Sequence, residues 1–309
     1  MMGLPQVLEA LVALAGAGWG PGGGGGSVKA ENDKQLPFLE HLAELRRRLF
    51  RCIIALLLGM GVAWNFSTDL LTFIERPLTG QTYLSQVKDR VYGALRQRYP
   101  TLYERYRLGE APAAVPPEAR KLNYTVPLEP FFVQIKISMI AGAILALPVV
   151  FYQLWLFIRP GLYRRERRLV VPFVAAGTVS FCLGALFFLF VIWPVIINFS
   201  LSYESEGLRS WFSLTAYVNF CLRLIAIFGL VFELPVAALI LGRLGLLTAP
   251  RLARGRRVAV LASAIVAAFH ADLVTMFVIW IPLYLMYEVS IWVVRLFGVK
   301  RGAGAAAPG

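Results

Sequence analysis

The sequence predicts an all-α membrane protein with about six transmembrane helices, both termini in the cytoplasm and a short fifth helix. Hydrophobic residues make up 58% of the 309 residues and charged residues only 16%. The mean hydropathy is +0.65, well above that of ordinary soluble domains. Apolar runs of the length needed to cross about 30 Å of hydrocarbon recur along the chain, and basic residues flank them.

Six apolar runs are the candidate membrane spans. In chain order they cover residues 49–66, 131–158, 169–199, 214–241, 258–271 and 273–294. The second run contains Pro148, which predicts a kink because proline cannot donate to the carbonyl four residues earlier. The fifth run would reach only about 21 Å as a helix, so we expect the bilayer to thin beside it or the protein to shield its end.

The basic residues predict the orientation of the spans. They crowd the segments before the first span, between the second and third, between the fourth and fifth, and after the sixth. These four segments should be cytoplasmic, which places both termini inside. The net charge of +13 therefore reflects membrane topology, and we expect no nucleic-acid partner. The long external segment at 67–130 is also charged, but long loops cross the membrane largely regardless of charge.

The strongest local motif is PFLEHLAELRRRLF at residues 37–50. Leucines 39, 42, 45 and 49 form one apolar stripe at helical spacing, and charged residues occupy the remaining faces. One interpretation is an amphipathic entry helix in which Glu44 pairs with Arg47 or Arg48 and the arginines only fix the topology.

The same residues support a second interpretation. His41, Leu42, Glu44, Leu45, Arg46 and Arg48 together resemble the HLxELRxR signature of the TatC family. This family is the multi-spanning signal-binding subunit of the twin-arginine, or Sec-independent, protein translocase. Further blocks resemble the family in the same order, at residues 76–78, 148–153, 159–168 and 232–236, so the resemblance covers about 37–295.

The resemblance also organises the chain. We expect a disordered glycine-rich leader at 1–35, a six-helix membrane domain at 36–299 and a short cytoplasmic tail at 300–309. Residues at about 80–121 resemble an external insertion, because relatives have a shorter first external loop. Pro77, Pro148 and Asp272 match structural or topological positions of the family. The prolines usual before Asp272 are absent, since the chain reads Phe-His-Ala-Asp there.

The resemblance implies two groups of functional residues. Glu44 and Glu166, with Glu40 and Arg46, would recognise the paired arginines of a signal peptide, since carboxylates bind guanidinium groups bidentately. Alternatively, Glu166 only neutralises one of the four arginines around it. Most of this face is basic and would repel such a peptide, so its few acids are the natural docking points.

Glu233 and Pro235, in the fourth span, form the second group. The resemblance implies a polar contact with a partner helix of the single-span TatA or TatB type. The alternative is a protonated Glu233 that bonds backbone groups freed by Pro235. The remaining implied properties are an oligomer in contact with membrane lipid, in the cytoplasmic (inner) membrane of a prokaryote.

No catalytic motif, cofactor fingerprint or metal-ligand spacing stands out, so the sequence predicts a non-enzyme without cofactor or metal. The expected function is recognition of twin-arginine signal peptides and nucleation of proton-gradient-driven export of folded proteins. The principal competitor is a proton-coupled secondary transporter that uses Glu233, Glu288 and Arg223. Arg223 and Glu233 lie ten residues apart, about 15 Å along one helix, and so do not pair directly.

The predicted topology can be tested with single cysteines placed near Arg98 and near Gly245. The loop charges put the first position outside and the second in the cytoplasm. An impermeant thiol reagent added to intact cells should therefore label only the cysteine near Arg98. Labelling restricted to the cysteine near Gly245 would invert the topology.

Overall fold

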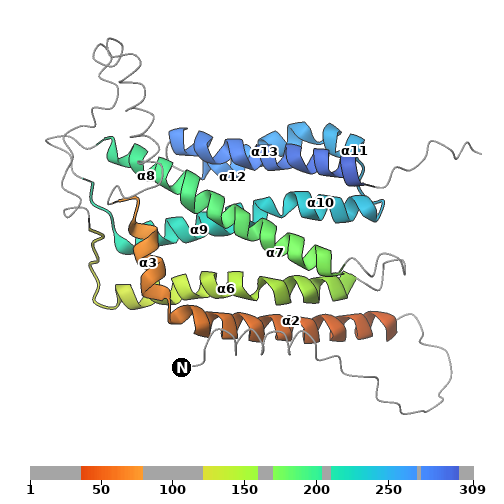
Figure 1. Cartoon of the computed structure of the whole chain (residues 1–309), viewed down its shortest axis with the longest axis horizontal. Helices are drawn as coiled ribbons and strands as arrows, with labels where there is room; N and C mark the ends of the chain where they lie inside the picture. Colours follow the sequence, from red (N-terminus) through yellow and green to blue (C-terminus); the bar gives the residue numbers. More distant parts are fainter. Residues whose placement is uncertain (1–35, 79–120, 159–169, 204–209, 270–272, 299–309) are drawn as a thin grey trace, which may run out of the picture. The chain divides into compact units, whose positions relative to one another are not determined.

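The computed structural model describes residues 36–78, 121–158, 170–203, 210–269 and 273–298, with side chains from residue 43 onward. Apart from one isolated bridge between Asn123 and Ser213, the regular structure in these ranges is helical (Figure 1). The elements are α2 Leu36–Trp64, α3 Ser67–Glu75, α6 Glu129–Ile158, α7 Val170–Phe187, the π-helix η4 Phe188–Ile192, α8 Trp193–Leu201, α9 Leu214–Phe232, α10 Leu234–Arg243, α11 Ala249–Arg254, α12 Arg256–Ala268 and α13 Leu273–Phe297. The predicted all-α class is confirmed.

Membrane-length helices account for most of the predicted spans. Four stretches of the described chain are long and apolar enough to cross a bilayer: Glu129–Phe157, Val170–Leu201, Leu214–Arg243 and Leu273–Phe297. A fifth results if α2 and α3, bent by 72° at residues 65–66, count as one broken span. Helix α12 has 13 residues, about 20 Å, and is shorter than the hydrocarbon core. The count of six spans and the cytoplasmic termini remain predictions.

Two of the long stretches contain breaks at proline. In the third predicted span, the five-residue π-helix η4 precedes Pro194, and the Trp193 N–H bonds to the Phe188 carbonyl five residues earlier. In the fourth, Glu233 ends α9 and begins α10, with Pro235 in the first turn of α10. Helix α6, by contrast, continues as one helix through Pro148. Proline removes one backbone donor, and each site adapts differently to that loss.

The described chain divides into two compact units. The first comprises the described residues within 36–67 and 135–179 and therefore holds α2, most of α6 and the first part of α7. The second comprises the described residues within 68–134 and 180–298, with α3 and all elements from η4 onward. The predicted leader, insertion and tail, at 1–35, about 80–121 and 300–309, lie almost wholly outside the described residues.

In the first unit, α2 and α6 approach each other closely at glycine. A Cβ atom on Gly142 would lie 2.3 Å from the Met60 backbone nitrogen, and one on Gly59 would lie 2.4 Å from the Gly142 carbonyl oxygen. Beside this contact, Ala55, Ala146 and Val149 form a buried cluster. Small residues allow such backbone proximity, which gives membrane helices their packing energy in the absence of water.

In the second unit, the end of α3 is tied to α8 and α9. The Trp193 Nε1–H and the Tyr217 hydroxyl both donate to the Ile74 carbonyl, at 3.1 and 2.9 Å. This carbonyl is in the last turn of α3, where the helix itself supplies no donor. Trp193 also packs against Phe188 in the buried centre of the unit.

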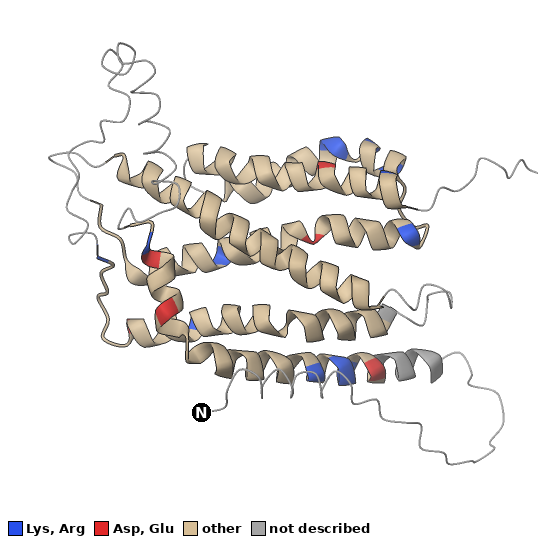
Figure 2. Ribbon diagram, in the orientation of Figure 1, with Lys and Arg blue, Asp and Glu red and all other residues tan. Residues whose placement is uncertain are grey.

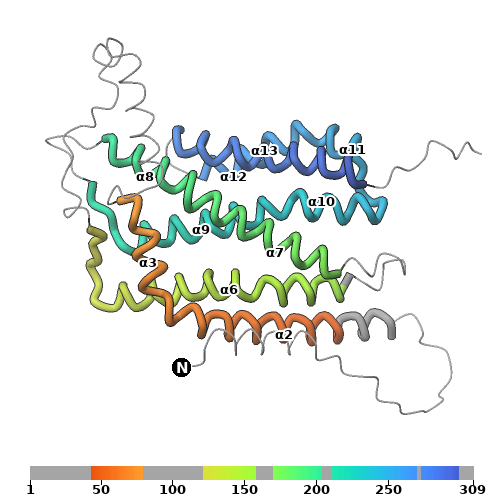
Figure 3. The backbone as a smooth tube through the Cα atoms, in the orientation of Figure 1, coloured from red at the N-terminus to blue at the C-terminus, as the bar shows by residue number. Residues whose placement is uncertain are grey.

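Helices α10, α11 and α12 of the second unit pack against α13 (Figure 3). Gly242 in α10 lies against Val294 of α13, where a Cβ atom would stand 3.2 Å from the valine side chain. Trp280 of α13 donates through Nε1 to the Val260 carbonyl of α12 at 3.4 Å. The short helix α12 thus depends on α13 for its position.

Replacing Gly142 by alanine should destabilise the protein, because the new methyl group collides with the Met60 backbone. Overpacking of this kind costs about 1 to 3 kcal/mol. Gly61 provides the matched control, since nothing lies within 4 Å of a Cβ atom there. Thermal unfolding in mild detergent should show a lower midpoint for Gly142→Ala and an unchanged or higher one for Gly61→Ala. Equal midpoints for both variants would contradict the close α2–α6 contact.

Candidate functional site

Glu44 lies on α2 within the arginine-rich part of the helix. Its Oε1 accepts hydrogen bonds from Nε of Arg48, at 3.1 Å, and from Nη2 of the same residue. Of the two partners that the sequence allowed, Arg47 and Arg48, the structure selects Arg48, one helical turn away. About 36% of the Glu44 side chain is exposed, and Oε2 makes no hydrogen bond with the described residues. Glu44 thus holds one guanidinium and keeps an oxygen available.

The other residues expected at this site are only partly visible. Arg46 is exposed on α2, two residues from Glu44. Glu40 belongs to the first turns of α2, but its side chain is not described, and Glu166 lies outside the described residues. The structure therefore places Glu44 and Arg46 on one helix and leaves the grouping of the three acids untested.

Glu233 occupies the junction between α9 and α10. Its side chain is half-buried, and its Oε1 atom is buried without a hydrogen-bond partner in the described part of the chain. A neighbouring polar group is satisfied, because the Ser180 hydroxyl donates to the Phe232 carbonyl. A buried carboxyl oxygen without a partner is costly, so it needs a proton, a water molecule or a group from another molecule.

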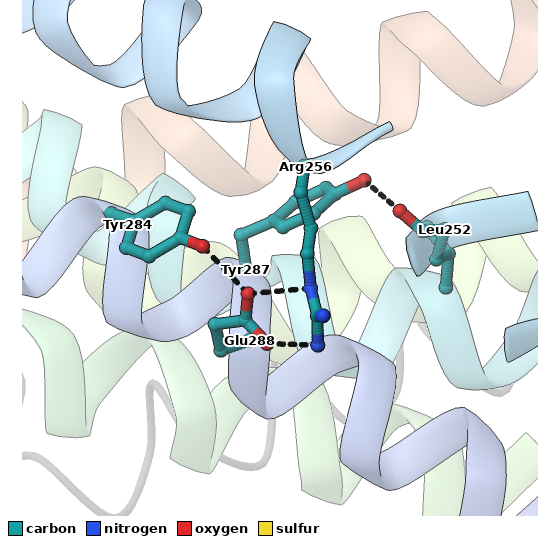
Figure 4. Close-up of polar contacts among 5 residues, drawn as sticks. All are labelled: Leu252, Arg256, Tyr284, Tyr287 and Glu288. Atoms are coloured by element: carbon teal, nitrogen blue, oxygen red, sulfur yellow. Dashed lines mark hydrogen bonds and ion pairs between the residues drawn. The ribbon is translucent and has the colours of Figure 1, made fainter. Parts of the chain in front are cut away.

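Glu288 pairs with an arginine that the sequence did not suggest (Figure 4). Arg256 binds both carboxylate oxygens of Glu288 through Nε and Nη2, each at 2.9 Å. The Tyr284 hydroxyl adds a third hydrogen bond at 2.7 Å. Arg223, the third residue of the transporter hypothesis, is exposed and makes no ion pair with any described residue. The structure thus commits Glu288 to Arg256, which weakens that hypothesis.

Gln153 of α6 is a polar residue whose environment the sequence did not reveal. It is 1% exposed, and both atoms of its amide lack a partner in the described structure. The sequence showed only its place in a family-like block at 148–153. An isolated glutamine in an apolar helix is a weak signal, because hydropathy alone does not say which face of the helix is covered.

Of the three residues expected to have structural or topological roles, the structure describes Pro77 and Pro148. Pro77 is buried and follows α3, in a turn closed by the Leu78 N–H bonding to the Glu75 carbonyl at 2.9 Å. Pro148 lies inside α6. Asp272 falls outside the described residues, so the missing prolines before it have no structural account.

These apolar helices of membrane length define the chain as a polytopic helical membrane protein. A family model described as the Sec-independent protein translocase protein (TatC) matches residues 40–282. The chain therefore belongs to the TatC family, a component of a protein translocase and not a family of enzymes.

Individual relatives agree with this assignment. The TatC protein of Desulforapulum autotrophicum is 33% identical over 274 residues, which cover 88% of this chain and 89% of the relative. The TatC protein of Aquifex aeolicus is 32% identical over 269 residues, which cover 86% of this chain and 98% of the relative. A solved structure described as the twin arginine translocase receptor TatC in DDM has a TM-score of 0.64 and 31% identity, and the match covers 84% of this chain and 100% of that one.

Proposed function

We propose that this chain recognises the paired arginines of twin-arginine signal peptides through Glu44, assisted by Glu40 and Glu166, at a site that also includes Arg46. The observation that carries the proposal is the Glu44 carboxylate, which already binds the guanidinium of Arg48 through one oxygen. Its second oxygen has no partner among the described residues, and the side chain is accessible. A carboxylate in this state accepts a second guanidinium without first breaking its internal ion pair.

The charge distribution supports the same docking point. Arginines dominate α11 and the beginning of α12, where Glu288 is already bound to Arg256. A doubly positive peptide is repelled from such a surface and attracted to a carboxylate with a free oxygen. Arg46 beside Glu44 limits this attraction, so more than one acid is needed for tight binding. Glu40 and Glu166 are the acids that we propose for this purpose.

We further propose that the unpartnered Glu233 oxygen contacts a helix of a second subunit, of the single-span TatA or TatB type. A polar group at a helix break in an apolar span gains most from a donor that arrives with another helix. In this proposal the chain works as an oligomer in the inner membrane of a prokaryote. Signal binding there nucleates an assembly that exports folded proteins, driven by the proton gradient.

Changing Glu44 or Glu166 to glutamine tests the docking carboxylates. If the acids only offset neighbouring arginines, each change should have little effect, because exposed ion pairs contribute about 0 to 1 kcal/mol. As ligands, each should lose a charge-assisted contact of roughly 1.5 to 3 kcal/mol, a drop in affinity of about 10- to 150-fold. The measurement is binding of a labelled twin-arginine peptide in native-like membranes, normalised to expression.

The matched control for this experiment is Glu288→Gln, which removes the same charge from a carboxylate already bound to Arg256. Its peptide affinity should equal that of the parent protein. The double variant of Glu44 and Glu166 should bind more weakly than either single one. Unchanged affinity in the double variant would eliminate this site, although membership in the family would stand.

Glu233→Leu separates a partner contact from a structural role. Leucine removes a buried oxygen that has no described partner, so membrane insertion and thermal stability should be unchanged or improved. Export of a twin-arginine reporter should nevertheless fall, because the incoming helix loses its polar contact. Stability and export are measured on the same variant, and normal export would return Glu233 to a structural role.

A further inference from the structure

Three arginines lie at the corner between α10 and α12, and we call Arg251, Arg254 and Arg257 the basic corner. Gly245, at φ +71°, ends α10, and the N–H groups of Gly245 and Leu246 bond back to the carbonyls of Gly242 and Leu241 at 3.2 and 3.0 Å. This closure lets the chain turn sharply, because glycine accepts a positive φ at no steric cost. Pro250 then lies in the first turn of α11, and Gly255 separates α11 from α12.

The corner is fixed to α13 by polar contacts (Figure 4). Arg256, between Arg254 and Arg257, forms the two-oxygen ion pair with Glu288. The Tyr287 hydroxyl donates to the Leu252 carbonyl of α11 at 2.8 Å. A Cβ atom on Gly255 would lie 2.7 Å from that hydroxyl, so the helices meet closely here. The basic corner is therefore presented on a braced backbone.

The ion pair uses the Glu288 carboxylate for Arg256, so this acid is not available to the other three arginines. Arg251, Arg254 and Arg257 are exposed, and none pairs with a described acidic residue. Of these three arginines, Arg251 donates a hydrogen bond from Nη1 to the Leu246 carbonyl, at 3.3 Å. In the second unit, the basic segments of α10, α11 and α12 gather at the same end of these helices (Figure 2).

Apolar side chains flank this charge. Leu246 is 61% exposed and Val258 is 70% exposed, one on each side of the basic corner in sequence. Arginines beside exposed aliphatic groups, at the end of membrane-length helices, match the boundary between headgroups and acyl chains. A soluble acidic protein would match the charge but would offer no reason for the exposed Leu246 and Val258.

We propose that the basic corner binds the phosphate groups of anionic phospholipids. The guanidinium groups of Arg251, Arg254 and Arg257 pair with headgroup phosphates, while Leu246 and Val258 contact the upper acyl chains. The predicted topology places this corner in the cytoplasmic leaflet, where anionic lipids attract basic segments near the surface. The inference goes beyond the proposed function, because the lipid occupies a surface that repels signal peptides.

The test titrates the purified full-length protein in mild detergent with fluorescent phosphatidylglycerol, and in parallel with phosphatidylcholine of the same acyl chains. Phosphatidylglycerol should bind more tightly, and its advantage should shrink as salt is added. In a triple variant, Arg251→Gln, Arg254→Gln and Arg257→Gln, affinity should fall about 100-fold, from about 5-fold per arginine. The corresponding triple lysine variant keeps the charges and should stay within a few-fold of the parent.

A second readout confirms that the variants are folded, because the twin-arginine peptide should bind the triple glutamine variant at least as well as the parent. Equal phosphatidylglycerol affinity in the parent and the triple glutamine variant would overturn the proposal. So would displacement of the lipid by inorganic phosphate at equal concentration, which would indicate a plain anion site. Tighter binding of an acidic polyglutamate peptide than of phosphatidylglycerol would assign the surface to a protein partner instead.

Discussion

Backbone polar groups inside a bilayer have no water to bond, and this constraint governs the structure. It explains why the membrane-length stretches are helical, and it directs attention to the places where helices break. Directly before Pro194, which has no N–H, the Trp193 N–H bonds to the Phe188 carbonyl five residues earlier. At the end of α2, the Ser67 hydroxyl donates to the Trp64 carbonyl at 2.9 Å. At both of these irregularities a hydrogen bond of another kind is present.

Packing between these helices follows from the same solvent. Lipid tails are as apolar as leucine, so helices gain little by burying apolar surface and gain more by close contact. In the first unit, Gly59 and Gly142 bring two backbones together, and in the second, Gly184 and Gly229 accommodate the neighbouring helix and the Phe181 ring. Within each unit, helices packed this closely are suited to hold polar groups at fixed positions in the membrane.

The carboxylates fall into different electrostatic states, and that difference separates their roles. Glu288 accepts two hydrogen bonds from Arg256 and a third from Tyr284, so it braces the α11–α12 corner. Glu44 binds Arg48 through one oxygen, and its other oxygen has no hydrogen bond with the described residues. Glu233 has a buried oxygen with no described partner. Only the last two have bonding capacity left for another molecule, which agrees with membership in a translocase family whose members work with other chains.

The sequence by itself determined the helical class, the approximate spans, the family and the Glu44–arginine pairing, because these depend on hydropathy and spacing along one helix. It also placed Glu233 and Pro235 at a disturbed position of the fourth span, but it did not predict the break between α9 and α10. Only the tertiary structure decided that Glu288 pairs with Arg256, 32 residues away, and that Trp193 and Tyr217 share the Ile74 carbonyl. Such contacts join different helices, and their partners are set by how those helices pack, which no local pattern encodes.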